Sequence, residues 1–264
     1  MANQTKPGRV ETAATAKILL FDCESFPNEG LTWGTWDQKV IKVTRRRMIC
    51  SVSWQWYPSR EKHVLALCDL PGYDPKKRTN KALMEAFSEV IGQADIAVGH
   101  NIDEFDDKMV NTDFLLNRLH PAAPHRTIDT LRICRGRFRL NSNRLGDVCE
   151  ELGIGKKLKH PGVEMWVGCM NGDRKSWAQM KAYNGHDVQP LLRGLYEHLR
   201  PWIINHPAMK PRGDFACPVC NSRRVISRGV RINRTGKVPR YQCRDCGKWA
   251  HGIWLAKKKA WVSA

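Results

Sequence analysis

The chain has few acidic residues for its length and no long apolar run. Its 264 residues include 44 Lys and Arg but only 26 Asp and Glu, which gives a formal net charge of +18. No apolar stretch approaches the roughly 20 residues that a membrane-spanning helix needs, and residues 1–16 lack the apolar segment of a secretory signal. We therefore expect a soluble, cytoplasmic protein that has no contact with a membrane and a disordered N-terminus over residues 1–16.

The shortage of acidic residues is most pronounced near the C-terminus. Residues 207–264 contain 14 Lys or Arg against Asp214 and Asp245, a net charge of +12. Such a polycation binds the phosphates of nucleic acid, although a basic segment can also serve solubility or bind a membrane surface. Because no amphipathic lipid-binding pattern is visible, we expect nucleic acid as the partner.

The ten cysteines do not indicate a disulfide framework, because a chain of this size can build its own core. Six of them are scattered and have the character of small buried apolar residues; they are Cys23, Cys50, Cys68, Cys134, Cys149 and Cys169. The other four form two C-x-x-C pairs, Cys217 with Cys220 and Cys243 with Cys246, separated by 22 residues. This spacing is typical of a four-cysteine zinc ribbon, and a disulfide pair or a redox use is the alternative.

The C-terminal region divides into a linker, a ribbon and a tail. Pro207, Pro211 and Gly213 indicate a linker over 207–213, which places the ribbon at 214–256 and a basic tail at 257–264. A segment this small needs one structural Zn²⁺ in place of an apolar core. Cationic and aromatic side chains of the ribbon are candidate contacts for nucleic acid; they are Arg223, Arg224, Arg228, Arg231, Arg240 and Tyr241. The alternative is that the ribbon docks a protein.

The remainder, residues 17–206, has the pattern of one α/β domain. An apolar run at 17–24 and an alternating one at 48–57 predict strands, and the spacing at 82–91 predicts a crossover helix before a short buried strand at 96–99. Residues 177–204 have apolar side chains at helical spacing. We expect one long helix there.

Two carboxylates end the first predicted strand. Asp22 and Glu24 are two residues apart, so on a strand they point to the same side. Like charges at the end of a buried strand repel each other and lose hydration. A divalent cation between them is the usual remedy, and an acidic loop is the alternative.

Further acidic candidates follow along the chain. Asp106 comes after the apolar Phe105 at the start of a predicted helix over 106–119, where it is either a metal ligand or a charge that favours the helix dipole. Asp187 lies one helical turn after Tyr183, on the face that continues as an apolar stripe. A carboxylate in that position needs a partner.

Three short motifs together resemble a known family. FDCE at 21–24, GHNIDEFD at 99–106 and YNGHD at 183–187 are similar, in order and spacing, to the three motifs of the DEDD (DnaQ-like) 3′–5′ exonuclease superfamily. The Y-x-x-x-D motif resembles the DEDDy branch, which includes the proofreading domains of family-B DNA polymerases. The resemblance implies a ribonuclease-H-like fold, in which helices flank a mixed sheet, over about residues 17–204.

The resemblance also implies roles for individual residues. Two Mg²⁺ or Mn²⁺ ions would be held by four carboxylates, those of Asp22, Glu24, Asp106 and Asp187. Tyr183 would orient the attacking water, and Asn101 of the second motif is a candidate contact for nucleic acid. His186 is not expected to be a catalytic histidine. It is adjacent to Asp187 on the predicted helix, so its side chain points away from the face of Tyr183.

The expected function is hydrolysis of nucleic acid from its 3′ end by a two-metal mechanism. Single-stranded DNA is favoured over RNA, in replication or proofreading, with a DNA polymerase or another replication protein as a possible partner. A catalytically inactive nucleic-acid-binding protein and a ribonuclease-H-like endonuclease are the alternatives. The presence of all five motif residues argues against the first, and Tyr183 argues against the second.

Overall fold

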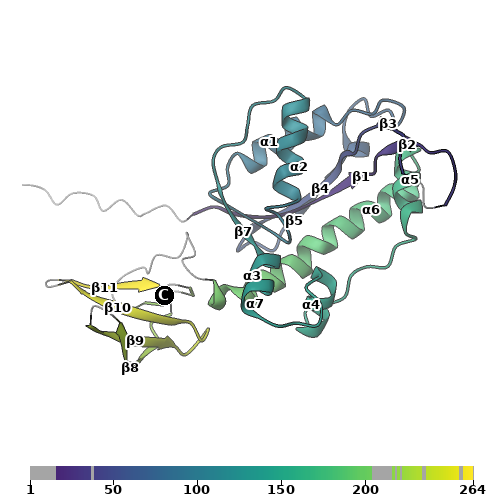
Figure 1. Cartoon of the computed structure of the whole chain (residues 1–264). Coiled ribbons are helices and arrows are strands. Elements are labelled where there is room, and N and C mark those ends of the chain that lie inside the picture. The colour runs from purple at the N-terminus through teal and green to yellow at the C-terminus, as the bar shows by residue number, and fades with distance from the viewer. Residues whose placement is uncertain are drawn as a thin grey trace, which may run out of the picture.

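The structure, a computed structural model, describes residues 16–36, 39–203, 216–217, 219–220, 222–233, 236–255 and 258–263 (Figure 1). Apart from Ala16, the expected disordered segment 1–16 lies outside the described residues, as does the expected linker 207–213. None of the described helices has the length and apolar character needed to cross a membrane.

A five-stranded mixed sheet with the order β5-β4-β1-β6-β7 forms the centre of the larger domain. β4 (Met48–Tyr57) pairs antiparallel with both β1 (Ile18–Phe26) and β5 (Lys62–Ala66), whereas β6 (Ile96–Gly99) and β7 (Arg126–Asp129) run parallel to β1. This order of strands and the helices around them confirm the predicted ribonuclease-H-like class.

The central strand β1 is buried on both faces, as its apolar run predicts. On one face Leu19 and Phe21 pack toward α1 (Lys81–Ile91), where the rings of Phe21 and Phe87 lie 5.4 Å apart. On the other face Ile18 and Leu20 join a separate core cluster that includes Tyr196. Because side chains alternate along a strand, Asp22 and Glu24 continue the face of Leu20.

Further helices surround the sheet (Figure 1). Their bounds are α2 (Asp106–Leu116), α3 (Thr130–Arg137), α4 (Leu145–Glu151) and α5 (Val163–Met170), with a short η1 (Leu67–Asp69) after β5. Five of the six scattered cysteines are buried in this domain and Cys68 is half-buried. The prediction that they act as apolar core residues therefore holds for five of them.

The prediction of one helix over 177–204 is wrong. The chain forms α6 (Arg174–His186), an irregular turn η2 (Asp187–Leu192), α7 (Arg193–Leu199) and a last short turn η3 (Arg200–Trp202). Pro190 lacks the N–H that a continuous helix requires, and Gln189 leaves helical geometry with φ −131° and ψ 112°. The break comes directly after α6, so Asp187 lies at a helix end and not in the middle of one.

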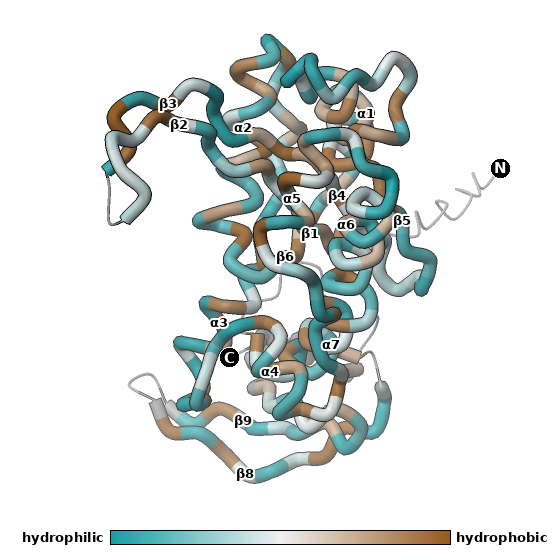
Figure 2. The backbone as a smooth tube through the Cα atoms, turned by 90° about the vertical axis from the view of Figure 1, so that its right-hand side faces the viewer, coloured by the Kyte–Doolittle hydropathy of each residue, from teal (hydrophilic) through white to brown (hydrophobic). Residues whose placement is uncertain are grey.

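A small two-stranded hairpin projects from the domain between β1 and β4. It consists of β2 (Glu29–Leu31) and β3 (Lys42–Arg45), which pair with each other and belong to no other sheet in the described residues. Figure 2 shows it standing away from the body at the end to which β1 leads.

The C-terminal module is an antiparallel sheet with the order β11-β10-β9-β8. Its strands are β8 (Val225–Asn233), β9 (Gly236–Cys243), β10 (Trp249–Leu255) and β11 (Lys258–Ser263). Within the segment expected as a basic tail over 257–264, residues 258–263 pair with β10 as a fourth strand.

Among the described residues, two hydrogen bonds join this module to the larger domain. The Lys248 ammonium donates to the carbonyl of Ile203 at 3.0 Å, and the Arg200 guanidinium donates to the carbonyl of Val219 at 2.7 Å. Arg200 also donates to the Tyr57 hydroxyl at 2.7 Å, so it links the first cysteine pair to the sheet of the larger domain.

Candidate metal centres and active site

Three of the four predicted acidic ligands meet at one point. Asp22, Glu24 and Asp187 each offer a carboxylate oxygen, and these oxygens all lie within 4.8 Å of one another. The first two come from β1, opposite Ser53 and Ser51 of β4, and Asp187 comes from the break after α6. Oxygen ligands from separate elements at this spacing suit Mg²⁺ or Mn²⁺.

The fourth acidic residue, Asp106, lies beside the same strand but outside this group of three. It begins α2, has only 2% of its surface exposed, and accepts a hydrogen bond from the backbone N–H of Cys23 at 3.0 Å. Because Cys23 lies between Asp22 and Glu24, that bond fixes Asp106 next to both.

The carboxyl groups of the cluster are in an environment that disfavours their charge. Burial, followed by repulsion from Asp106 and Glu24, raises the pKa of Asp22 well above its usual range. Burial is also the largest cause that raises the pKa of Glu24 to about 8 and that of Asp106 to about 7. A bound divalent cation would reverse this preference, which is why the site fits a metal.

Lys157 supplies the positive charge nearest to Asp187. Its ammonium donates to Asp187 Oδ2 at 2.6 Å and to the Tyr183 hydroxyl at 3.0 Å. Burial alone would lower the pKa of Lys157, but the Asp187 carboxylate and these hydrogen bonds raise it. The other oxygen of Asp187 is buried and finds no hydrogen-bond partner among the described residues, so it is available to a cation.

The sequence patterns did not single out Lys157 as a ligand partner. It belongs to a basic loop whose Lys156, Lys157, Lys159 and His160 can either bind phosphate or remain solvated. Only the fold brings this loop against Asp187, which is 30 residues further along the chain.

Asn184 is a second residue of the site that the sequence did not reveal. Its side chain is fully buried and donates to Asp22 Oδ2 at 2.7 Å, while its Oδ1 accepts from the Ser51 hydroxyl at 2.8 Å. The Ser53 hydroxyl donates to its backbone carbonyl at 2.7 Å. Its place next to Tyr183 in the YNGHD motif was the available signal.

Gly185 permits this close approach of α6 to the sheet. A Cβ at this position would lie 2.8 Å from Cγ2 of Val64 on β5, which is shorter than real contacts allow. A glycine inside a helix weakens it, and here the cost is offset because Asn184 and Tyr183 come close to β1 and β4.

Tyr183 is held by packing around its ring. Its ring lies 4.9 Å from that of His160 and 6.4 Å from that of Trp166, both near edge-on, and 9% of its surface is exposed. Burial raises the pKa of its phenol, so the group is a hydrogen-bond donor at neutral pH. His186 lies elsewhere, with Nε2 2.8 Å from the carbonyl oxygen of Lys156.

A cleft of about 970 Å³ opens onto the acidic cluster. Asp22 and Asp187 lie in its wall, and five of its lining residues are cationic; these are Arg135, Arg144, Lys156, Lys157 and Lys159. A strand of nucleic acid that reached the carboxylates would meet these cations with its phosphates.

Asn101 lies near this cleft in a turn and has a positive φ of 73°. Its backbone N–H donates to Asp129 Oδ1 at 3.0 Å. The neighbouring His100 has its two ring nitrogens 2.9 Å from the Thr130 hydroxyl and 2.9 Å from the Asn143 carbonyl oxygen. The turn therefore holds β6, α3 and the loop before α4 together.

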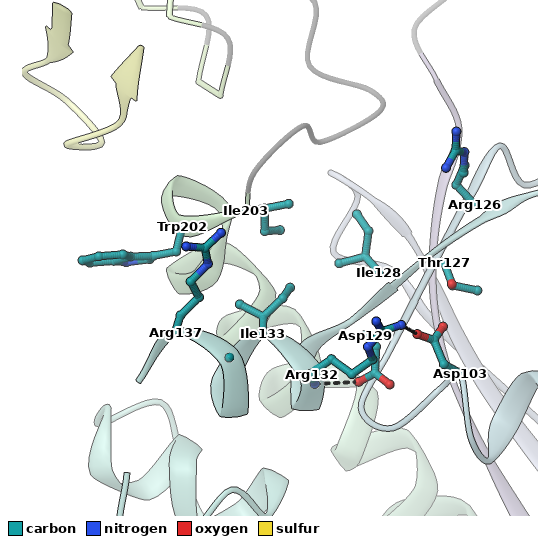
Figure 3. Close-up of a pocket in the computed structure, with 11 residues that line it drawn as sticks. Asp103, Arg126, Thr127, Ile128, Asp129, Arg132, Ile133, Arg137, Trp202 and Ile203 are labelled. Carbon is teal, nitrogen blue, oxygen red and sulfur yellow. Dashed lines mark hydrogen bonds and ion pairs between the residues drawn. The ribbon is translucent and has the colours of Figure 1, made fainter. Parts of the chain in front are cut away.

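A second hollow of about 750 Å³ lies between β7, α3 and the end of η3 (Figure 3). Of its two acidic residues, Asp103 pairs with Arg132 at 2.7 Å, and Asp129 caps the N-terminus of α3 with Oδ1. The Oδ2 atom of Asp129 is buried and has no hydrogen-bond partner among the described residues. In Figure 3, Arg137 points toward Trp202 at the other end of the hollow. This arrangement brings no carboxylate cluster together.

The four paired cysteines also meet at one point. Their sulfur atoms lie within 4.8 Å of one another, with 3.6 Å between Cys217 and Cys246 and 3.6 Å between Cys220 and Cys243. A tetrahedron of sulfurs with metal bonds of about 2.3 Å has edges of about 3.8 Å, whereas a disulfide requires about 2.0 Å. The cluster fits one Zn²⁺ and excludes the disulfide alternative in this structure.

Backbone groups complete the cysteine site. The N–H of Val219 donates to the sulfur of Cys217 at 3.4 Å, and the N–H of Asp245 donates to that of Cys243 at 3.4 Å. A hydrogen bond from Cys246 is the largest cause that lowers the pKa of Cys217 to about 5. Donors aimed at sulfur favour the thiolate form that binds zinc.

The five arginines predicted to bind nucleic acid are exposed on the ribbon, and Tyr241 is half-buried. Arg224 pairs with Asp245 at 2.8 Å, and the Arg240 guanidinium lies 5.6 Å from the ring centre of Trp249. The structure thus places them on the same module as the four-cysteine cluster.

A mixed sheet flanked by helices, with a carboxylate cluster on its central strand, defines a ribonuclease-H-like exonuclease fold, here joined to a zinc-ribbon-type module. Residues 72–164, about a third of the chain, match the family model described as Exonuclease (RNase_T). Of the five motif residues, that span contains Asp106 but not Asp22, Glu24, Tyr183 or Asp187. It also contains Lys157. No curated protein sequence matches the chain.

The chain is similar in structure to the family B DNA polymerase from the hyperthermophilic archaeon Pyrobaculum calidifontis. The match has a TM-score of 0.53 and 18% sequence identity, and covers 72% of this chain and 25% of that polymerase. At this identity the likeness shows the fold, and the chain corresponds to about a quarter of the polymerase. The match of residues 72–164 to the Exonuclease family model supports a nuclease function.

Proposed function

We propose that the chain is a metal-dependent 3′–5′ exonuclease that hydrolyses phosphodiester bonds in single-stranded DNA. The observation that carries this proposal is the convergence of Asp22, Glu24 and Asp187, with Tyr183 one helical turn before Asp187. The similarity to a polymerase of family B supports a role in replication, with a DNA polymerase or another replication protein as partner.

In this proposal the four carboxylates of Asp22, Glu24, Asp106 and Asp187 hold two divalent cations. When bound, such cations supply the activation of water and the neutralisation of phosphate charge that the reaction requires. Asn184 keeps the Asp22 carboxylate in place through its 2.7 Å hydrogen bond. Asp106 is held by the backbone of Cys23, so the ligands are positioned before substrate arrives.

Tyr183 and Lys157 have the remaining roles in the reaction. Tyr183 donates a hydrogen bond to the attacking water and orients it, because a phenol with a raised pKa is a poor base. Asp187 would offer a cation its unpartnered Oδ1, while its Oδ2 accepts from Lys157. The Lys157 ammonium, at the wall of the basic cleft, would be placed to contact a substrate phosphate as well.

The ribbon holds one structural Zn²⁺ and retains the nucleic acid near the active site. Its exposed arginines are phosphate contacts, and Tyr241 is a candidate for base stacking. Docking of a partner protein on the ribbon is the competing role, and the salt dependence of binding separates the two.

The test is digestion of matched single strands of DNA and RNA, each labelled at the 3′ or the 5′ end, with Mg²⁺, Mn²⁺ or EDTA. The proposal requires metal-dependent release of mononucleotides from the 3′ end. The 5′-labelled strand should then give a ladder of products that become progressively shorter. Internal cuts would identify an endonuclease. Binding without any cleavage in either metal would identify an inactive nucleic-acid-binding protein.

A further inference from the structure

The β2–β3 hairpin carries a concentration of exposed apolar residues that the active site does not explain. The exposed fractions are 89% for Trp33 and 85% for Trp36, two of the largest apolar side chains a protein can leave in water. Aliphatic residues of the same hairpin are also exposed, namely Leu31, Val40, Ile41 and Val43. In Figure 2 this hairpin stands clear of the domain. Exposed apolar side chains gathered on one projecting element are typical of an interaction surface.

The base of the hairpin is firmly anchored. Arg46 forms an ion pair with the fully buried Asp113 of α2 at 2.6 Å, and Asn28 accepts from the backbone N–H of Arg47 at 2.6 Å. Arg78 pairs with Glu29 at the start of β2. The exposed side chains therefore stand on a defined support.

These anchors connect the hairpin to two of the three elements that supply the acidic ligands, β1 and α2. β1 carries Asp22 and Glu24 and leads directly into β2. The guanidinium of Arg47 lies 6.0 Å from the ring centre of Phe105, the residue before Asp106. The hairpin thus projects from the border of the carboxylate site.

The charge of the hairpin indicates the chemistry of its partner. Residues 28–47 contain five Lys or Arg and two acidic residues, a net charge of +3. One of the acidic residues, Glu29, is paired with Arg45 and Arg78. Lys39 and Lys42 are both exposed. A partner must offer negative charge and flat apolar surface together.

We propose that the β2–β3 hairpin is a stacking arm for single-stranded nucleic acid, on which Trp33 and Trp36 stack with bases while Lys39 and Lys42 contact phosphates. Unpaired bases are the common ligand that supplies both flat apolar faces and regular negative charge. This inference rests on the proposed function and adds a substrate contact beyond the carboxylate cleft. It predicts a preference for unpaired strands over duplexes, whose bases already stack on each other.

The test is the affinity of the double variant Trp33→Ala/Trp36→Ala for a fluorescent 30-nucleotide DNA strand, measured in EDTA so that no cleavage occurs. Loss of two stacking contacts should raise the Kd roughly tenfold or more. A strand of equal length and charge whose bases are replaced by abasic sites should bind wild type and variant equally. Trp33→Phe/Trp36→Phe should restore most of the affinity for the normal strand.

Ile41→Ser/Val43→Ser is the matched control, since it removes exposed apolar surface from the same hairpin without removing an aromatic ring. It should leave the Kd within about twofold of wild type, whereas a protein-docking patch would depend on these residues as well. An unchanged Kd in the tryptophan variant, or an equal loss with the abasic strand, would overturn the stacking arm. The stacking arm would also be overturned if Ile41→Ser/Val43→Ser weakened binding of the normal strand more than twofold.

The failure of this inference can be distinguished from failure of the proposed function. Hydrolysis of a nucleoside 5′-(p-nitrophenyl phosphate), which is too small to reach the hairpin, should be the same in wild type and the tryptophan variant. Absence of hydrolysis in wild type with Mg²⁺ or Mn²⁺ would count against the exonuclease proposal alone. The binding measurement in EDTA would still decide the role of the hairpin.

Discussion

Replacement of Asn184 by alanine should destabilise the larger domain and weaken the site together. The Asn184 side chain is fully buried, with its amide on Asp22 and its oxygen on Ser51. Alanine removes three hydrogen bonds, those to the carboxyl group and the backbone carbonyl of Asp22 and the one from Ser51, at about 1–1.5 kcal/mol each. The better helix propensity of alanine returns less than about 1 kcal/mol. We expect a net loss of about 3 kcal/mol in the free energy of unfolding.

The assay is urea unfolding in EDTA, combined with a titration of Mg²⁺ or Mn²⁺ against activity. Asp22 would lose the donor that holds it, so half-maximal activity should require more metal as well. Asn111→Ala is the matched control, because Asn111 is an exposed asparagine on α2 that donates to Asp107 at 3.1 Å. That variant should lose less than about 0.5 kcal/mol. An Asn184 variant as stable as the control, with unchanged metal dependence, would refute the positioning role.

Four further predictions concern charge, water, zinc and pH. Asp22→Asn should abolish cleavage without lowering metal-free stability, because it removes a repelled charge and keeps an oxygen for Asn184; full activity would remove Asp22 from the ligand set. Tyr183→Phe should slow cleavage by about 10- to 100-fold and leave metal affinity unchanged in a calorimetric titration, and a matching loss of affinity would make it a structural residue. Elemental analysis should find one zinc per wild-type chain and none in Cys243→Ser. This variant should show a weaker salt dependence of strand binding but should still cleave short oligonucleotides. If the variant keeps the wild-type affinity and salt dependence, the ribbon is a protein-docking module. In EDTA, the pKa values of Glu24 and Asp106 are raised to about 8 and about 7, so the folded state holds protons that the unfolded state releases. The free energy of unfolding measured in urea should therefore fall as the pH rises from about 5 to 8. A rise in that free energy over this range would contradict the raised pKa values.

Features carried by neighbouring residues were predictable from the chain. Asp22 and Glu24 share a strand face because side chains alternate, and the two C-x-x-C pairs close a tetrahedron because each pair forms one knuckle. The structure brings both groups together as predicted. The α/β order of the larger domain followed in the same way from the periodicity of apolar residues.

The helix after Trp177 shows where local pattern was insufficient. The apolar stripe continues through the break, because Leu191 and Leu195 are both fully buried. Periodicity therefore predicted one helix, while Pro190 removed the N–H that one helix needs. The apolar spacing over 177–204 indicates which side chains are buried against the sheet. Such burial does not require an unbroken helix.

The sequence by itself determined which carboxylates and thiolates are available and which of them are neighbours along one element. Only the tertiary structure decided that Lys157 pairs with Asp187, that Asn184 holds Asp22, and that the tryptophans of the β2–β3 hairpin face water. The first two contacts join positions that are 30 and 162 residues apart. Side chains this distant meet only when the sheet and α6 have packed, so no local spacing encodes them.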